Sequence, residues 1–275
     1  MVKLALIKAT ITSLVVIANV LSTKDCSGTE KKTEAIKREV KFLTADNQAQ
    51  REIEADEKLC SAIKSLKANK NLDAEKLLLD AQSKIIQLTE AEPSNYLYYY
   101  YLGRVQAELV NEYVSCKNEK KAKEMIDEAI ESLKESISLK EDFAESHSYL
   151  GFIYGRKIGL GGPMEGILFA PIVTKEHKRA FQLDPDNPVV LVNLGLHYLY
   201  TPRQWGGNKK KSEACFKKAK EVASRFADSY IWLGVLYDKE GKEKDAIEMY
   251  QKALQIDPDN KLARSQLAKY RYLNR

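Results

Sequence analysis

The sequence predicts an all-α fold, an α-solenoid in which pairs of helices stack on one another. Glycine and proline are few, at 13 and 7 of 275 residues, and they mostly separate long segments rich in Lys, Glu, Ala and Leu, which favour helices. No segment shows the apolar and polar alternation that is typical of a strand. Similar Leu-Gly segments recur, and their glycines, Gly103, Gly151, Gly195 and Gly234, are 48, 44 and 39 residues apart. Self-similarity at such spacings indicates stacked helix pairs.

The chain begins with the layout of a secretory signal peptide. Lys3 and Lys8 precede a largely apolar run over residues 9–21, and small and polar residues follow it. We expect cleavage after Ser22, which predicts an exported protein, periplasmic or extracellular. The run is short for a bilayer core of about 30 Å, and an uncleaved membrane anchor over residues 4–21 is the alternative reading of residues 1–22.

Residues 23–50 are charged and carry no repeat, so we expect a charged N-terminal helix or a tether there. Loss of Lys3 and Lys8 with the leader lowers the formal charge from +5 to +3. That balance is too mild to imply nucleic acid as a partner. Lysine clusters such as residues 209–211 lie among acidic residues at helical spacing, which indicates a solvated helix surface.

The cysteines give no sign of a metal site. Cys26, Cys60, Cys116 and Cys215 are widely separated, without a CxxC pair or a Cys/His spacing. Oxidation in pairs is open to an exported protein, and the sequence leaves the pairing undetermined. Cys215, on a helix beside Phe216, is interpreted as a small buried residue.

No catalytic motif is present in the sequence. His147, His177 and His197 are isolated along the chain, and the first two fall at helix positions where other repeats place core residues. There is no nucleophile elbow, no HExxH and no motif of paired carboxylates. The sequence therefore predicts a protein that is not an enzyme and that needs neither a cofactor nor a metal.

The clearest repeat is "ADSYIWLGVLYDKEGKEKDAIEMYQKALQIDPDN", residues 227–260. Gly234 and Ala246 are small, which lets two paired helices approach closely, and Tyr250 fills the space between layers. Pro258 ends the second helix. At nearly every diagnostic position this segment resembles a tetratricopeptide repeat (TPR), a pair of antiparallel helices of about 34 residues.

The same pattern recurs upstream with extra residues between the two helices of each unit. Its markers are Leu102 with Ala129 and Leu133, Leu150 with Ala180, and Leu194 with Ser212 and Phe216. An earlier unit keeps mainly a second helix, which includes Ala81 and Ile85. We expect a solenoid of about four or five units over residues 51–260 and a capping helix over 261–275, with Leu262, Leu267 and Tyr270 facing inward.

Two insertions interrupt this pattern. In "TPRQWGGNKKK", residues 201–211, we expect Pro202 to end a helix, Gly206 and Gly207 to adopt positive φ, and Asn208 to cap the next helix. Trp205 is interpreted as a plug that anchors this long turn, with contact to a partner as the alternative. Residues 155–173 are rich in glycine, and we expect a loop that packs on itself or covers a groove.

The TPR resemblance implies a right-handed solenoid whose first helices line a concave groove that holds a peptide or a helix. It places ten residues in this groove: Tyr100, Arg104, Ser148, Phe152, Arg156, Val192, Leu196, Tyr200, Ile231 and Val235. Among them Tyr100 is the strongest candidate, because tyrosine offers a large contact area at a low cost in entropy. The alternative is that some of these residues pack against the chain's own insertions. The lysine and asparagine clamp of chaperone-binding TPR domains is absent.

The segment "DPDNPVVLVNLGLHYLYTPRQWGG" resembles exported bacterial TPR proteins with a TP-x-x-aromatic-Gly-Gly turn, some of which partner solute transporters. A weaker likeness, in "KEHKRAFQLDPDN", is to the regulator of microtubule dynamics family. We therefore expect a non-catalytic scaffold that binds another protein in its concave groove. The alternative is a periplasmic component that encloses a small apolar ligand for a transporter; an apolar pocket of about 300 Å³ or more would favour it.

Overall fold

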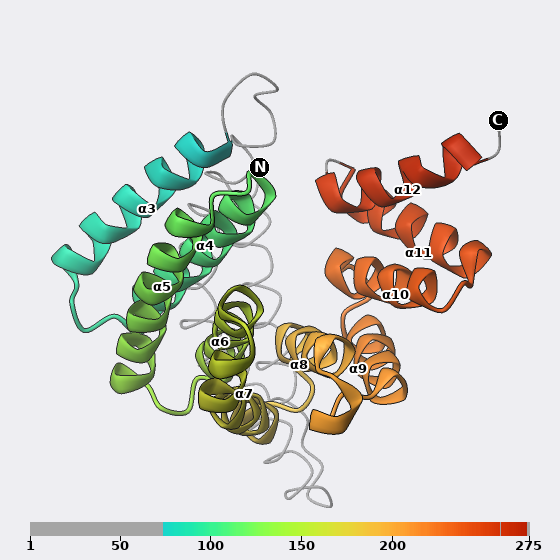
Figure 1. Cartoon of the computed structure of the whole chain (residues 1–275). Coiled ribbons are helices and arrows are strands. Elements are labelled where there is room, and N and C mark those ends of the chain that lie inside the picture. Colours follow the sequence, from blue (N-terminus) through green and yellow to red (C-terminus); the bar gives the residue numbers. More distant parts are fainter. Residues whose placement is uncertain (1–73, 259, 274–275) are drawn as a thin grey trace, which may run out of the picture. The chain divides into compact units, whose positions relative to one another are not determined.

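The computed structural model describes residues 74–258 and 260–273 (Figure 1). The predictions for the signal peptide or anchor, for residues 23–50 and for the start of the solenoid at 51–73 lie outside these residues, as do Cys26 and Cys60. Cys116 is exposed and Cys215 is half-buried, and both are free thiols. None of the described helices is long and apolar enough to cross a membrane.

Across the described residues the chain is helical, with no strand. The α-helices, in chain order, are α3 (Ala74–Ala91), α4 (Tyr96–Ser115), α5 (Glu119–Leu139), α6 (Ala144–Gly161), α7 (Pro163–Leu183), α8 (Pro188–Tyr200), α9 (Lys209–Val222), α10 (Ala227–Lys239), α11 (Glu243–Ile256) and α12 (Lys261–Leu273). A short 3₁₀ helix, η1 (Arg203–Trp205), lies between α8 and α9.

The helices pack in consecutive pairs, α4 with α5, α6 with α7, α8 with α9 and α10 with α11 (Figure 1). The first helices also touch one another, since α4 contacts α6, α6 contacts α8 and α8 contacts α10. They therefore form one continuous layer. The last pair is capped by α12, where Ala263 and Tyr270 are buried and the Tyr270 hydroxyl donates to Asp238 Oδ1 at 2.7 Å.

Each pair is held at close range by a glycine of the first helix and a large residue of the second. A Cβ added to the glycine would lie 2.4–3.0 Å from the nearest atom of that side chain, so only glycine fits without a shift. The four contacts are Gly103 with Leu133, Gly151 with His177, Gly195 with Phe216, and Gly234 with Tyr250. Their partners are 30, 26, 21 and 16 residues apart in sequence, so the insertion shortens from one pair to the next.

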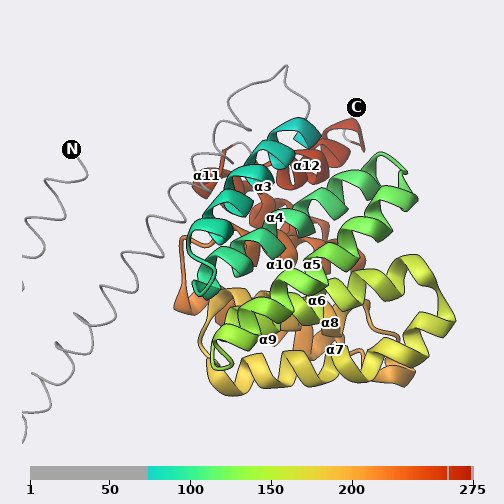
Figure 2. The same cartoon turned by 90° about the vertical axis from the view of Figure 1, so that its left-hand side faces the viewer.

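The glycine-rich segment 155–173 is helical, so the expectation of a loop there is wrong. Helix α6 continues to Gly161, Gly162 turns the chain at φ +91°, and Pro163 opens α7 (Figure 2). Proline suits this first helical position because its missing N–H would have no partner there. Gly155 is exposed, and a Cβ there would meet nothing within 4 Å, so this glycine weakens α6 without marking a turn.

The turn over residues 201–208 follows the expectation in part. Helix α8 ends before Pro202, Gly206 is left-handed at φ +100°, and the Asn208 side chain accepts from the Lys211 N–H at 3.0 Å. Gly207 differs, because it is not among the residues with positive φ. A Cβ on Gly207 would lie 1.7 Å from the Thr201 carbonyl oxygen, so glycine is required there for close backbone approach.

Candidate functional site

The layer of first helices presents a surface with aromatic and arginine side chains that are at least partly exposed. We call it the first-helix face and define it by six residues: Arg104, Tyr149, Phe152, Arg156, Tyr200 and Trp232. They come from α4, α6, α8 and α10, which contact one another in series, so the face crosses four helix pairs.

At the α4 end of the face, Arg104 lies over two tyrosines. Its guanidinium carbon is 5.5 Å from the Tyr100 ring centroid and 5.6 Å from that of Tyr149, which suits cation–π contact. Tyr100 itself is only 4% exposed, because Phe143 and Tyr149 pack edge-on against it at 5.1 and 5.7 Å. The expectation that Tyr100 is accessible is therefore wrong. Tyr100 is buried and packs against Arg104 and Tyr149.

Arg156 sits between α6 and α4 with its hydrogen-bonding capacity only partly used. Its Nη2 donates to Asn111 Oδ1 at 2.7 Å, while its Nε is buried and has no hydrogen-bond partner among the described residues. Burial lowers the pKa of Arg156, and the nearby Glu108 carboxylate partly opposes this shift. A guanidinium keeps its charge through such a shift, so Arg156 remains a cationic donor for a carboxylate or carbonyl oxygen.

The α8 and α10 end of the face is aromatic. Tyr200 is 57% exposed, the Trp232 ring meets it edge-on at 6.4 Å, and Lys239 Nζ lies 5.1 Å from its centroid. Phe152 packs against the core cluster that contains Leu196. Partly exposed tyrosine and tryptophan rings offer a large contact area with a polar edge, which is typical of protein-binding surfaces.

The ten residues assigned to the groove from sequence thus fall into two layers. Arg104, Phe152, Arg156 and Tyr200 retain exposure, whereas the other six are buried. The buried ones are Tyr100, Ser148, Val192, Leu196, Ile231 and Val235. Sequence reasoning missed Tyr149 and Trp232, which directly follow two residues assigned to the groove, Ser148 and Ile231. Their aromatic side chains were the feature of the sequence that could have assigned them to this face.

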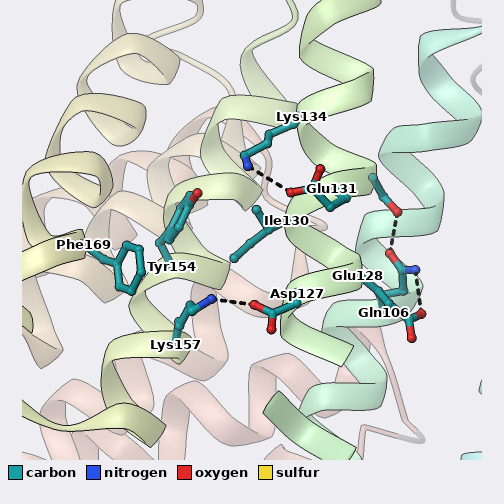
Figure 3. Close-up of a pocket in the computed structure, with 10 residues that line it drawn as sticks. Gln106, Asp127, Glu128, Ile130, Glu131, Lys134, Tyr154, Lys157 and Phe169 are labelled. Carbon is teal, nitrogen blue, oxygen red and sulfur yellow. Dashed lines mark hydrogen bonds and ion pairs between the residues drawn. The ribbon is translucent and has the colours of Figure 1, made fainter. Parts of the chain in front are cut away.

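A second feature is an open hollow of about 610 Å³ between α5, α6 and α7 (Figure 3). On one side Tyr154 and Phe169 stack with their centroids 5.3 Å apart. On the other side acidic residues of α5 are paired, Asp127 with Lys157 at 2.5 Å and Glu131 with Lys134 at 3.0 Å (Figure 3).

The polar side chains of this hollow bond mainly to one another. Ser132 Oγ donates to Gln106 Oε1 at 2.8 Å, and Gln106 Nε2 donates to Glu128 Oε2 at 3.4 Å. A small-molecule site usually combines an enclosed apolar cavity with a few polar groups free to orient the ligand. This hollow is open and its donors and acceptors are engaged, so it lends no support to an enclosed site for a small apolar ligand.

His147 and His177 lie in the core, as the sequence predicts, whereas His197 is half-buried. His147 Nδ1 is 2.6 Å from Glu176 Oε2, and its Nε2 is 2.8 Å from the Glu141 carbonyl oxygen. The His177 ring is tilted against that of His197 with their centroids 5.2 Å apart, and burial together with His197 lowers the pKa of His177 to about 3. Within the described residues no three His, Cys, Asp or Glu side chains gather as a metal site would require.

Comparison with known proteins bears on the repeat and on the fold. Residues 227–260 match the tetratricopeptide repeat family, and they are the residues that carry the complete repeat signature in sequence. No curated protein matches the chain.

Several solved structures are similar to this chain at low sequence identity. TTC0263, a thermophilic TPR protein of Thermus thermophilus, has 18% identity and a TM-score of 0.56 over 78% of this chain and 97% of that chain. YrrB, described as a TPR protein with an unusual peptide-binding site, has 20% identity and a TM-score of 0.38 over 69% of this chain and 82% of that chain. PilF of Pseudomonas aeruginosa has 18% identity and a TM-score of 0.41 over 62% of this chain and 68% of that chain.

The likeness to the Thermus protein confirms the predicted fold, a right-handed α-solenoid of stacked TPR helix pairs with inter-helix insertions and a capping helix. TPR proteins are generally non-catalytic scaffolds that bind other proteins. The likenesses to exported bacterial TPR proteins and to the regulator of microtubule dynamics family stay predictions.

Proposed function

We propose that this protein is a non-catalytic scaffold that binds a peptide or a helix of another protein across the first-helix face. The observation that carries this proposal is the row of partly exposed Arg104, Phe152, Arg156 and Tyr200 on successive first helices. A rigid layer of helices can hold such side chains in place before a partner arrives, which lowers the entropic cost of binding.

The chemistry of the face favours a partner segment that combines apolar or aromatic anchors with an acidic or carbonyl-rich stretch. Phe152 and Tyr200 supply apolar contact, while Arg156 has a donor that the described part of the chain leaves unused. Because an arginine can bond a carboxylate in a planar, two-bond geometry, an aspartate or glutamate of the partner fits opposite Arg156.

Peptide selection from a random library on the full chain, followed by fluorescence anisotropy on purified variants, tests the proposal. Tyr200→Ala and Arg156→Gln alter half-exposed side chains, and each is expected to weaken the selected peptides about tenfold or more, as truncation of an interface anchor does. Val222→Ala is the matched control, because Val222 is exposed at the end of α9 and lies outside the face. Tyr100→Ala and Leu196→Ala are unsuitable, since both residues are buried and would report on folding.

If the selected peptides bind the folded Tyr200→Ala and Arg156→Gln variants as tightly as the parent chain, the first-helix face is not the binding surface. Loss of binding in Val222→Ala alone would instead place the interaction on the outer, second-helix side of the solenoid.

A further inference from the structure

The hairpin formed by the end of α6 and the start of α7 is unusually poor in charge. Between Ile158 and Thr174 the only charged residue is Glu165, in a chain with 30% charged residues. The Glu165 side chain folds against Gly161, where an added Cβ would meet it within 2.3 Å. The hairpin therefore presents mainly apolar groups.

These apolar groups form a stripe on the solvent side of α7. Met164 and Ile167 are each 66% exposed and Leu168 is 61% exposed. With the exposed Pro171 they follow the i, i+3, i+4, i+7 spacing that places residues on one side of a helix. The opposite side of α7 holds the buried Gly166, Val173 and His177, so this helix carries one apolar side toward the core and a second toward solvent.

Positive charge continues the same stripe toward the end of α7. Lys175 and Lys178 follow Pro171 by four and seven residues, which places them on the same side, and both are exposed. Lys175 Nζ lies 3.8 Å from Glu176 Oε1, but that carboxylate is buried and held by His147. The outward side of α7 thus combines an exposed apolar half with a cationic half.

Trp205 packs on the side of α7 opposite this stripe. A Cβ on Gly166 would be 3.2 Å from Cζ3 of the Trp205 ring, so the indole packs on the start of α7, yet it remains 52% exposed.

We infer that the outward side of α7, formed by Met164, Ile167, Leu168, Lys175 and Lys178, docks on an anionic lipid bilayer. The apolar residues would enter the boundary between headgroups and acyl chains, and the lysines would meet lipid phosphates. Since no described helix can span a bilayer, the hairpin would lie in the interface. A soluble partner would need apolar groups and anions at matching positions along one short stripe. An anionic bilayer offers acyl chains to the apolar residues and phosphates to the lysines at every point of its surface.

The test measures co-sedimentation of the full chain with lipid vesicles. The chain is expected to co-sediment with vesicles of phosphatidylcholine that contain a minor share of phosphatidylglycerol. Ile167→Ser with Leu168→Ser is expected to lower the vesicle partition coefficient about tenfold or more. Both side chains are exposed, so the fold is retained. Lys175→Glu with Lys178→Glu is expected to weaken binding to these vesicles but not to pure phosphatidylcholine.

Leu139→Ser with Val222→Ser is the matched control, because both residues are exposed and apolar but lie on other helices. The variants keep the N-terminal apolar run, so vesicle binding through that run would survive Ile167→Ser with Leu168→Ser, which would overturn the inference. It would also be overturned if the stripe variants abolished self-association in sedimentation equilibrium while the parent chain ignored vesicles, since the occupant would then be a second copy.

Discussion

The imidazole of His177 packs directly on Gly151, with ring atoms 3.0–3.1 Å from the place a Cβ of residue 151 would take. His177 is buried and also packs against the His197 ring, so its own ring has little room to move. Gly151→Ala is therefore expected to lower the free energy of unfolding by about 1–2 kcal/mol, because overpacking outweighs the gain in helix propensity.

Gly155→Ala in the same helix is the matched control. Nothing lies within 4 Å of its added Cβ, so the substitution is expected to raise the free energy of unfolding by up to about 1 kcal/mol. Urea unfolding of both variants gives the comparison. Equal effects at residues 151 and 155 would contradict a close contact between Gly151 and His177.

His177 also makes stability depend on pH. In the folded chain its pKa is lowered from 6.5 to about 3, by burial first and by His197 second. A lowered histidine pKa means that the unfolded chain binds a proton more readily than the folded chain, so acid favours unfolding. The part of the free energy of unfolding that depends on a neutral His177 is complete above pH 6.5 and is lost as the pH falls toward 3. Between pH 7 and pH 5 the free energy of unfolding is expected to fall by about 2 kcal/mol for this reason.

His177→Leu tests this origin, because Leu133 holds the equivalent position against Gly103 and shows that leucine fits there. Urea unfolding at pH 7 and pH 5 gives the fall in the free energy of unfolding for each chain. This fall is expected to be about 2 kcal/mol smaller in the variant than in the parent chain. Burial also lowers the pKa of His197, so the stability of the variant is expected to keep a smaller dependence on pH. An unchanged difference between the two pH values would show that His177 is not the source.

The repeat could be predicted from sequence because its markers act locally. Gly234 and Tyr250 are 16 residues apart and their contact needs only the two helices that carry them. The glycine-rich hairpin was not predictable in this way. Glycines at 155 and 159 suggest a loop, but in α6 they lie where no neighbour approaches, and the packing of α6 on α7 outweighs their weak helix propensity.

The accessible part of the candidate site was predictable only in outline. Tyr100 has the spacing of a groove residue, yet Phe143 and Tyr149, which come from the following pair, bury it. Burial of this kind depends on how two units stack, and one repeat does not encode that. The same limit explains Trp205: its partner Gly166 belongs to the preceding pair, so the sequence showed that the indole needs a contact but not which one.

The buried pair of His147 and Glu176 joins α6 to α7, with Nδ1 and Oε2 2.6 Å apart. Both side chains are buried, so removal of either partner leaves the other without its bond in a site of low dielectric. His147→Ala is expected to lower the free energy of unfolding by about 3 kcal/mol. In a double-mutant cycle with Glu176→Gln, the double variant is expected to lose less stability than the sum of the two single losses, by about 1 kcal/mol or more. Additive losses would contradict a direct interaction.

The turn between α8 and α9 depends on two residues in different ways: Gly207 allows a close backbone approach, and Trp205 packs its ring on Gly166. A Cβ on Gly207 would meet the Thr201 carbonyl oxygen at 1.7 Å, a backbone atom that moves only if the turn opens. Gly207→Ala is therefore expected to lower the free energy of unfolding by about 2 kcal/mol or more. Trp205→Ala removes a half-exposed ring that rests on Gly166, so a smaller loss of about 1 kcal/mol is expected. Thermal unfolding followed by circular dichroism compares the two variants. A larger loss for Trp205→Ala than for Gly207→Ala would mean that the indole, and not the close backbone approach, holds this turn in place.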